Sequence, residues 1–476
     1  MKTDCTSERL HFGRVGRREI VAEFSGGSLS SDGGALLLRL AEEKTGIVRT
    51  FVQRAMLDHR RQSYVTHSLE DLVMQRVFAI ALGYEDLNDH DVLRFDSLLA
   101  AAMGKRDPLG EERRPSEVGK PLASSATLNR LELVSDDPEK DRYRRVQLIV
   151  NEAEEFFVDY YVASVNQHHG GPGDWIVLDL DPSDIQLHGK QEGAFYHGYY
   201  KGYCYLPLYA FAGEHLLTPH LQTADGDAAR NAIPVLERIV PKLREAWPDV
   251  GIMVRADSGF CRDALFCWLE ENEVDYVIGV ARNGRLEKAV AKEVEEAKKL
   301  YEETGEPARL FKDLLNWTTL DSWSRERRVV AKAEYLSGKA NPRFVVTSFT
   351  EAEVEPWQIY EVEFCPRGEA ENRIKEQQLD LFGTRASCST MAGNQIRLFF
   401  SGLAYLLVQA IRALGLKGTD LCRAQAGTIR VKLFKIAAAV KVTTRKVWIR
   451  LSNYCPFAAV FTRARDNLSA CPVLVM

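Results

Sequence analysis

The stretch GIMVRADSGFCRDALFCWLEE, from Gly251 to Glu271, joins a short apolar run to an amphipathic segment through a turn. The apolar run ends on a carboxylate, Asp257, which is followed by Ser258 and Gly259. The first half is typical of a buried strand, and the second half has the apolar spacing of a helix. An acid at this junction either caps the helix or holds a metal ion over a reaction centre.

The composition is that of a globular protein with ample core, since 45% of its 476 residues are hydrophobic and 27% are charged. This length predicts about two to four domains. We find no run of about 18 apolar residues, so no membrane span is predicted. The charged start of the chain does not resemble a secretory signal. The nine cysteines form no C-x-x-C pair, which predicts free thiols in a reducing cytoplasm.

Charge is distributed unevenly along the chain. Between Arg397 and Arg450 there are eleven Lys or Arg residues and a single acid, Asp420. Because the whole chain carries a net charge of −5, the remainder carries about −15. This asymmetry predicts a basic, phosphate-facing module on an acidic body, with Arg445 and Lys446 as candidate DNA contacts. The alternative is a solvated basic helix face.

Residues 1–150 are predicted to be mostly helical. Ser68 and Asp71 have capping-box spacing at the start of SLEDLVMQRVFAIALG, and Gly83 is expected to end that helix. A second helix is expected over NDHDVLRFDSLLAAAMG, followed by an exposed loop over residues 105–121. Such a helical region either binds DNA or supports another domain.

Beyond Trp175 the sequence changes to short β-rich runs. WIVLDLD, YCYLPLYAFAG and HLLTPHLQT are predicted strands, after which helices and strands alternate. The order β-β-β-α-β-α-β-α predicts a mixed sheet with helices on its faces. It is the strand order of the ribonuclease H-like fold. The segments RRVVAKAEYL, RFVVTSFT and YEVEFC are predicted to be strands of an inserted β-rich region.

Three groups of carboxylates could carry chemistry. Asp179 and Asp181 are two residues apart on the first predicted strand, so they share a face near its end. Asp257 ends a later strand, and Glu371 and Glu376 lie on different faces of a predicted helix. Mg²⁺ prefers such oxygen ligands, and two ions about 3.5–4 Å apart promote phosphoryl transfer. Each acid alone is more often a cap, so the prediction depends on their combination.

We therefore expect an α/β protein with a ribonuclease H-like mixed sheet, a β-rich insertion and helical terminal regions. Five regions are predicted: a helical DNA-binding or support region (1–150), the first part of the catalytic domain (174–305), the β-rich insertion (306–364), the rest of the catalytic domain (365–415) and a basic C-terminal region (416–476). The sequence of the last region is compatible with either strands or helices.

Three segments together resemble the DDE transposases of bacterial insertion sequences: LDLDPSDIQLHGKQEGAFYHGYYKGYCYLPLYAF, VRADSGF and RGEAENRIKEQQLDLF. Within that group the sequence resembles the insertion-sequence thirteen-eighty family, which is related to the insertion-sequence-four group. The resemblance extends from ATLNRLE to about AYLLVQAI. It implies Asp181, Asp257 and Glu371 as the catalytic and metal-binding acids. The distance to the HG pair that follows favours Asp181 as the first acid, and Asp179 is the alternative or a supporting residue.

Related transposases also have a spaced pattern of Tyr, two residues, Arg, three residues, Glu, six residues and Lys. Arg and Glu match here, whereas Tyr and Lys do not: the positions hold Phe364, Arg367, Glu371 and Gln378. The match makes Arg367 a supporting residue. The phosphate contact expected of the family's Lys is assigned either to Gln378 or to Lys375, one turn earlier on the same helix face.

The resemblance implies an enzyme that binds two divalent ions, Mg²⁺ or alternatively Mn²⁺. In such enzymes water attacks the transposon end, and the freed 3′-hydroxyl then attacks target DNA. The implied partners are double-stranded DNA, as terminal inverted repeats and as target, and a second subunit on the DNA. No membrane partner is expected. The expected location is the cytoplasm, at the bacterial nucleoid.

Related transposases carry a β-rich insertion between the second and third acids, and some use an aromatic there to hold a flipped base beside a DNA hairpin. Trp317 and Trp323 are the candidates, because an indole stacks on an unpaired base. The neighbouring Arg325, Arg327 and Arg328 suggest that phosphate lies nearby. The alternative is that both indoles are packed in the protein.

The histidines and tyrosines near FYHGYYKGYCY invite a metal-site interpretation. We expect instead a hairpin packed against the first strand. A plain nuclease or junction resolvase would share the acids but lack end-specific binding and joining. An inert DNA-binding protein derived from a transposase would be expected to lose acids that are present here. A glycosidase also uses paired carboxylates, but nothing in the chain indicates a sugar-stacking groove.

Overall fold

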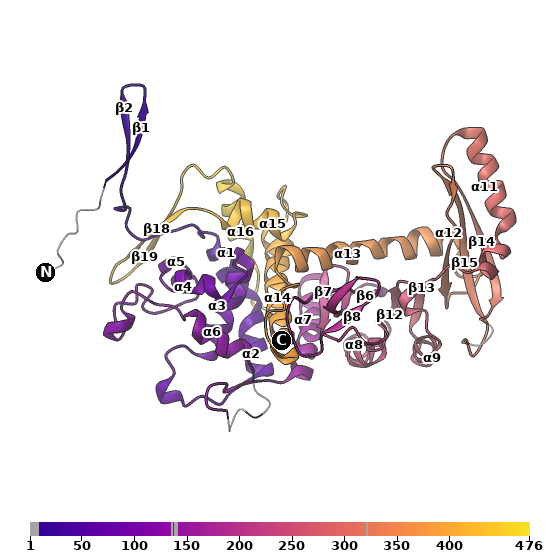
Figure 1. Ribbon diagram of the computed structural model, residues 1–476, viewed down its shortest axis with the longest axis horizontal. Coiled ribbons are helices and arrows are strands. Elements are labelled where there is room, and N and C mark those ends of the chain that lie inside the picture. The colour runs from indigo at the N-terminus through magenta and orange to yellow at the C-terminus, as the bar shows by residue number, and fades with distance from the viewer. Residues whose placement is uncertain (1–8, 135–136, 138–140, 320–321) are drawn as a thin grey trace. The chain divides into compact units, whose positions relative to one another are not determined.

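The computed structural model describes residues 9–134, 137, 141–319 and 322–476. Its contacts divide the chain into two compact units, each assembled from segments that are far apart in sequence (Figure 1). The larger unit comprises Thr45–Arg60, Glu132–Gln409 and Val473–Met476, and the smaller comprises Met1–Lys44, Arg61–Leu131 and Ala410–Pro472.

The larger unit is built on a mixed sheet. Strand β6 (Trp175–Pro182) pairs antiparallel with β10 (Leu208–Ala212) and parallel with β12 (Gly251–Ala256). Beyond them, β11 (His215–His220) is antiparallel to β10, and β13 (Asp275–Val280) is parallel to β12. The order β11-β10-β6-β12-β13 confirms the predicted ribonuclease H-like topology.

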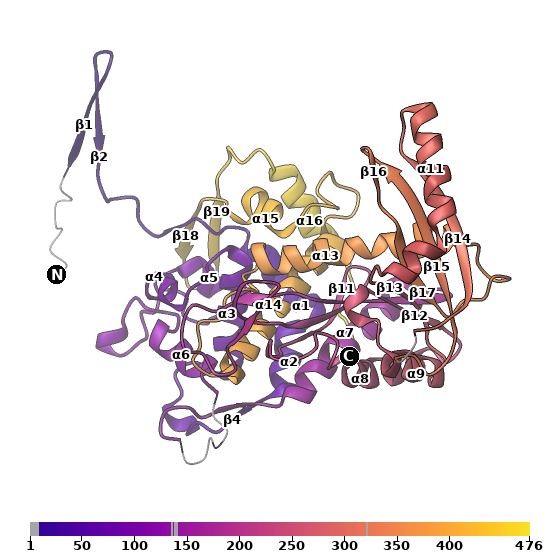
Figure 2. The same cartoon turned by 45° about the vertical axis from the view of Figure 1, so that its right-hand side comes forward.

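The β-rich insertion extends this sheet beyond β13. There β17 (Arg343–Thr347), β15 (Arg327–Leu336) and β14 (Ala308–Trp317) follow one another in antiparallel pairing. The short strand β16 (Lys339–Ala340) pairs with β15, and helix α11 (Ala291–Thr304) lies along β14 and β15 (Figures 1 and 2). The described residues of this region therefore continue the mixed sheet.

The predicted strand YEVEFC is wrong, because Ile359–Phe364 is a π-helical segment. It continues α12 (Pro356–Gln358), whose first turn is closed by a capping box between Glu355 and Gln358. Ile359, Tyr360 and Phe364 pack on one buried cluster, whereas Val362 is 50% exposed. The alternating apolar letters suggested a strand, but burial follows a helical spacing.

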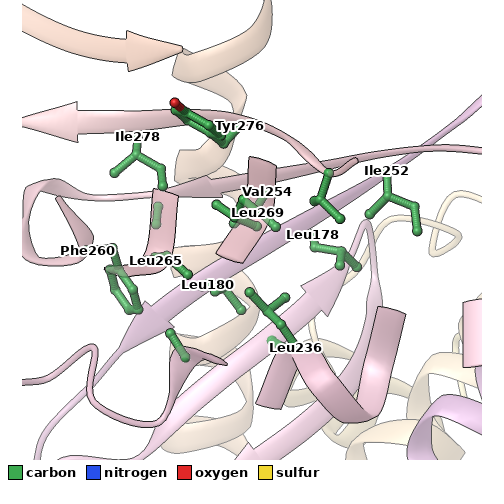
Figure 3. Close-up of a cluster of buried hydrophobic side chains, with 14 of the residues drawn as sticks. Leu178, Leu180, Leu236, Ile252, Val254, Phe260, Leu265, Leu269, Tyr276 and Ile278 are labelled. Carbon is green, nitrogen blue, oxygen red and sulfur yellow. The ribbon is translucent and has the colours of Figure 1, made fainter. Parts of the chain in front are cut away.

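Alternation of side chains along β6 and β12 separates the core from the site. Leu178 and Leu180 on β6 and Ile252 and Val254 on β12 face a buried cluster (Figure 3). That cluster also includes residues of α8 (Ala232–Ala246) and α9 (Asp263–Glu271). Because successive strand residues point to opposite faces, the acids of β6 lie on the other side of the sheet.

Helix α14 (Met391–Ala410) begins a longer apolar run than the sequence analysis counted. Over the described residues, the helical run Met391–Gly415 is long and apolar enough to span a membrane by length and composition alone. Arg397 and Arg412 interrupt this run, so the sequence contains no uninterrupted apolar stretch of that length there. Its most apolar window is 89% buried inside the protein, so the structure uses it as a core helix.

Helix α3 (Leu69–Leu82) in the smaller unit confirms the predicted capping box. The hydroxyl of Ser68 accepts the N–H of Asp71, and the Asp71 carboxylate accepts the N–H of Ser68, both at 3.1 Å. Gly83 ends the helix with a left-handed φ of 98°. Here the local sequence signals and the structure agree completely.

The single helix predicted over NDHDVLRFDSLLAAAMG is wrong. The segment forms two short helices, α4 (His90–Leu93) and α5 (Ser97–Ala102). The carboxylate of Asp96 accepts the N–H of Leu99 at 2.8 Å and caps the second helix. A capping residue inside an apolar periodic run therefore starts a new helix.

The basic C-terminal region contains both strands and helices. β18 (Ala438–Val442) and β19 (Val447–Leu451) form a hairpin, and β18 also pairs with β3 (Leu29–Ser30). Helices α15 (Ala426–Ile429) and α16 (Ala458–Ala470) lie on either side of this hairpin in sequence. The basic residues are thus distributed over several elements.

An ion pair and two glycines join the two ends of the smaller unit. Lys435 lies 2.6 Å from Asp32, whose exposure is only 1%. The N–H of Gly33 donates to the carbonyl of Ile436 at 2.9 Å. A Cβ on Gly34 would meet the Leu433 carbonyl oxygen at 2.2 Å, so only glycine permits this close approach.

We predict that Gly34→Ala destabilises the smaller unit, because the added carbon overlaps backbone rather than a flexible side chain. Overpacking of this kind costs about 2 kcal/mol or more. Thermal unfolding of the full chain should show a lowered Tm for that unit. Gly26→Ala is the control, because its Cβ would meet only the Leu29 side chain. Equal Tm values for the two variants would contradict the prediction.

Candidate active site

A buried ion pair lies at the centre of the sheet. The guanidinium of Arg255 on β12 donates from Nε and Nη2 to the two carboxylate oxygens of Asp179 on β6, each at 2.7 Å. Asp179 and Arg255 are 3% and 9% exposed. The third nitrogen, Nη1, donates to the backbone carbonyl of Glu363 at 2.8 Å. Arg255 therefore connects β6, β12 and the helical segment, and both carboxylate oxygens of Asp179 are occupied by it.

Asp181 lies two residues further along the same face, where β6 ends. Its Oδ1 is 3.4 Å from Nη1 of Arg367, and Nη2 of Arg367 is 2.7 Å from Oε1 of Glu371. Glu371 lies on α13 (Gly368–Lys375), one turn after Arg367. One guanidinium therefore links the first and third predicted acids.

The pKa of Asp181 shows how closely the acids gather. It is raised to about 7, first by burial, and then by the nearby charges of Asp257, Glu371 and Asp179, while Arg367 opposes the rise. Like charges favour the protonated form of a carboxyl group, and burial acts in the same direction. A strongly raised pKa at converging strand ends is typical of a functional site.

Arg262 is the N-cap of α9, so the helix-capping alternative is wrong for Asp257, which caps the turn before that helix instead. Oδ1 of Asp257 accepts the N–H of Gly259 at 2.8 Å and caps the short turn Ser258–Phe260. Asp257 also raises the pKa of Asp181, so its charge faces the same space. Gly279 on β13 makes room for this turn, because a Cβ there would meet the backbone N of Ser258 at 2.9 Å.

Phe364 and Gln378, at the Tyr and Lys positions of the spaced pattern, both have contacts within the larger unit. Phe364 packs in a buried cluster, and the guanidinium of Arg367 lies 5.9 Å from the centre of its ring. Gln378 is buried, and its Nε2 donates to Oγ of Ser183 at 2.9 Å. Its amide thus supports the turn after Asp181. Lys375 is exposed on α13.

Trp317 and Trp323 are both half-buried against the core of the larger unit. The guanidinium of Arg285 lies 4.8 Å from the centre of the Trp317 ring. Trp323 meets Phe266 edge to face at 5.5 Å, and Arg327 lies 5.7 Å from its ring. Both indoles therefore already have partners within the protein.

The arginines beside these tryptophans form internal ion pairs. Arg327 pairs with Asp263 and Glu270, each at 2.8 Å, and Arg328 pairs with Asp313 at 2.7 Å. Arg325 also contacts Glu270, at 2.5 Å. The suggestion of nearby phosphate is therefore weakened, because these charges are compensated by acids of the insertion and α9.

Arg445 and Lys446 lie in the smaller unit, at the exposed tip of the β18–β19 hairpin. Thr443 and Lys446 exchange backbone hydrogen bonds that close the turn. The ammonium of Lys446 lies 5.2 Å from the centre of the Trp448 ring. The tip thus presents two adjacent cations to solvent.

Arg255 is the principal site residue that the sequence analysis missed. A signal was present, because an arginine inside the apolar run GIMVRA requires a partner if the strand is buried. Asp179 on the neighbouring strand is the acid that could satisfy it. The parallel pairing that places the two residues side by side is visible only in the structure.

The three acids provide oxygen ligands suited to a hard divalent ion. Among the described residues, however, no group of three His, Cys, Asp or Glu side chains already has the arrangement of a metal site. Arg367 lies between Asp181 and Glu371 and neutralises part of their charge. The three carboxylates fit divalent ions if the Arg367 guanidinium moves away from them or contacts them together with the ions.

The ribonuclease H-like sheet with carboxylates gathered at its strand ends defines the class of this protein as a mixed α/β fold. The chain belongs to the family described as transposase DDE domain group 1, which matches residues 12–473. It is therefore a transposase of the DDE type.

Among solved structures, the chain is similar to a piggyBac transposase synaptic complex with hairpin DNA, determined by cryo-electron microscopy. The sequences are 14% identical and the TM-score is 0.37. The match covers 85% of this chain and 79% of that chain. No curated protein matches the chain.

We predict that Asp181→Asn stabilises the metal-free protein more at pH 8 than at pH 5. The folded pKa of Asp181, about 7, lies above its ordinary value of 3.8. Stability is therefore lost as pH rises between these values, because the carboxyl group ionises in the unfolded chain while it stays protonated in the folded protein. The substitution should restore on the order of 2–3 kcal/mol more at pH 8 than at pH 5. Thermal unfolding in chelator measures the difference.

Asp179→Asn is the matched control on the same strand. It leaves Arg255 buried without its full charge partner, so it should destabilise the protein at both pH values, by roughly 3–5 kcal/mol. If Asp181→Asn changed the Tm equally at pH 5 and pH 8, the raised pKa would be wrong.

Proposed function

We propose that this transposase cleaves DNA at transposon ends and joins those ends to target DNA. The observation that carries the proposal is the gathering of Asp181, Asp257 and Glu371 at the strand ends of a ribonuclease H-like sheet, in a chain of the DDE transposase family. These three acids would hold two divalent ions, Mg²⁺ or Mn²⁺. Bound ions of this kind activate the attacking oxygen and stabilise the leaving oxygen.

Asp181 is the first acid and Asp179 is a positioning residue. The carboxylate of Asp179 is occupied by two hydrogen bonds from Arg255, whereas Asp181 faces the other two acids. Asp257 is the second acid, held in place by its cap on the following turn. Glu371 is the third acid, presented by α13.

Arg367 positions Glu371 and lowers the repulsion between the acids before DNA binds. A guanidinium in this place also suits a phosphate of the DNA strand, which it can contact with two parallel donors. Gln378 supports the turn at Ser183, so the exposed Lys375 takes the phosphate contact expected of the family's Lys.

The proposed partners are double-stranded DNA, as terminal inverted repeats and as target, and a second copy of the protein on the DNA. The proposed source is a bacterial insertion sequence of the thirteen-eighty family, acting at the nucleoid in the cytoplasm. The exposed pair Arg445 and Lys446 would contact DNA phosphates, and Trp317 or Trp323 would act on a flipped base only if its present contacts open.

We predict that Asp181→Ala, Asp257→Ala and Glu371→Ala each abolish cleavage and joining. Losing one ligand removes several kcal/mol of charge stabilisation, which is roughly a thousandfold in rate. The assay combines purified protein, Mg²⁺ and a DNA that carries the inverted repeats flanking the gene. Products are resolved by denaturing electrophoresis.

Glu369→Ala is the control for this assay, because Glu369 is an exposed acid on the same helix as Glu371. It should retain wild-type cleavage and joining. The assignment of the acids is wrong if Asp257→Ala and Glu371→Ala remain as active as the wild-type protein. Cleavage by the wild-type protein without any joining would instead identify a nuclease or resolvase.

We predict that replacing Arg445 and Lys446 together by Ala makes DNA binding less dependent on salt. Each lost phosphate contact reduces the slope of log K against log salt by about 1, so the slope should fall by roughly 2. Fluorescence anisotropy over a salt series measures it. Lys298→Ala is the control, since Lys298 lies beside Glu295 and Glu302 on α11. An unchanged slope in the double variant would exclude these contacts.

A further inference from the structure

The small sheet that follows Asp181 extends from the part of the molecule where the acids gather. β7 (Ile185–Gln186) begins four residues after Asp181. β9 (Gly202–Tyr205) pairs with both β7 and β8 (Phe195–His197). The chain then enters β10, which pairs with β6. Both ends of this small sheet are therefore fixed beside the first acid.

Four aromatic rings of this sheet and its turn are open to solvent. The exposed fractions are 42% for Phe195, 60% for Tyr196, 83% for Tyr199 and 56% for Tyr203. Tyr196 and Tyr203 are cross-strand partners whose ring centres are 5.8 Å apart. Large apolar groups that gather on a surface mark an interaction site. The proposed roles of the acids and of Arg367 do not require these rings.

Tyr200 connects this aromatic surface to the acids. Its pKa is raised to about 12, first by burial and then by the charges of Asp184, Asp181 and Asp257. The Tyr199 ring stands perpendicular to that of Tyr200, with centres 5.0 Å apart. Tyr200 thus lies within the field of two of the proposed catalytic acids, and Tyr199 lies one ring further out.

The charge of this surface favours bases over the phosphate backbone. Within residues 183–205, Asp184 and Glu192 balance Lys190 and Lys201. Both acids already accept hydrogen bonds from within the protein, and both lysines are exposed. A surface with no net charge and several open rings gains more from stacking on neutral bases than from binding phosphate.

The two tryptophans of the insertion offer less open surface. Trp317 is covered by Arg285, and Trp323 is packed against Phe266 and Arg327. Of these aromatic groups, Tyr199 is the most open to solvent. The site of base stacking is therefore assigned to a different element from the one predicted by sequence.

We propose that the β8–β9 hairpin binds unpaired bases of the DNA strand beside the scissile phosphate, with Tyr199 as the main stacking ring. This inference rests on the proposed function, because that function places the DNA strand against the acids. Bases inside a duplex are stacked on their neighbours and offer no free face. A base that binds here is therefore frayed or flipped out of the helix.

The experiment compares binding of two probes to the full-length protein in chelator. One probe is a short single-stranded oligothymidylate, and the other is an abasic oligonucleotide of equal length. Tyr199→Ala should weaken oligothymidylate binding roughly tenfold or more, with abasic binding unchanged. Tyr199→Trp should restore the wild-type affinity. Tyr454→Ala is the control, because Tyr454 is 89% exposed in the smaller unit.

Equal loss of both probes by Tyr199→Ala would overturn the proposal, because Tyr199 would then contact the backbone. Unchanged affinity of Tyr199→Ala for both probes would also overturn it. So would a loss of oligothymidylate affinity, with abasic affinity unchanged, that occurs only in Trp317→Ala or Trp323→Ala. Because the measurement needs neither metal nor cleavage, it is independent of the proposed catalytic roles. Active Asp257→Ala and Glu371→Ala enzymes would refute the proposed function and leave this binding result standing.

Discussion

The structure depends on the buried pair of Asp179 and Arg255. Their two hydrogen bonds fix β6 against β12 in one parallel register, and the bond from Arg255 to the Glu363 carbonyl attaches the helical segment that leads to α13. A buried ion pair adds little net stability compared with apolar residues, but breaking it is expensive. Its main effect is therefore specificity, because a shift of either strand would leave a buried charge without its partner.

That register determines where the acids proposed for catalysis lie. With Asp179 beside Arg255, Asp181 falls at the end of β6 and Asp257 follows the end of β12. The same arginine holds the segment that places Glu371 against them. The cost of this arrangement is the raised pKa of Asp181, which reflects burial and mutual repulsion. Arg367 offsets part of that repulsion.

Sequence patterns predicted those features that are local or repeated along the chain. The capping box at Ser68 and the order of the strands followed from periodicity and short signals. Three features did not follow, because each is decided by distant contacts. The partner of Asp179 is 76 residues away, YEVEFC is helical because of what its side chains bury, and the insertion's tryptophans are covered by residues of other segments. The sequence spacing of Asp179 and Asp181 could not show which of the two carboxylates faces an arginine.

The path of the chain after Asp181 explains why catalysis and base binding would share one element. β6 must be followed by an antiparallel neighbour, so the chain leaves the sheet at its acidic end and returns there in β10. Whatever lies between is held within reach of the first acid. In this protein the intervening segment is a small sheet with open rings, anchored by Ser183 to Gln378 on the helical segment after Glu371. The hydrogen bond between Ser183 and Gln378 thus links the segments that follow the first and third proposed acids, and a base held at Tyr199 would set the position of the phosphate next to it.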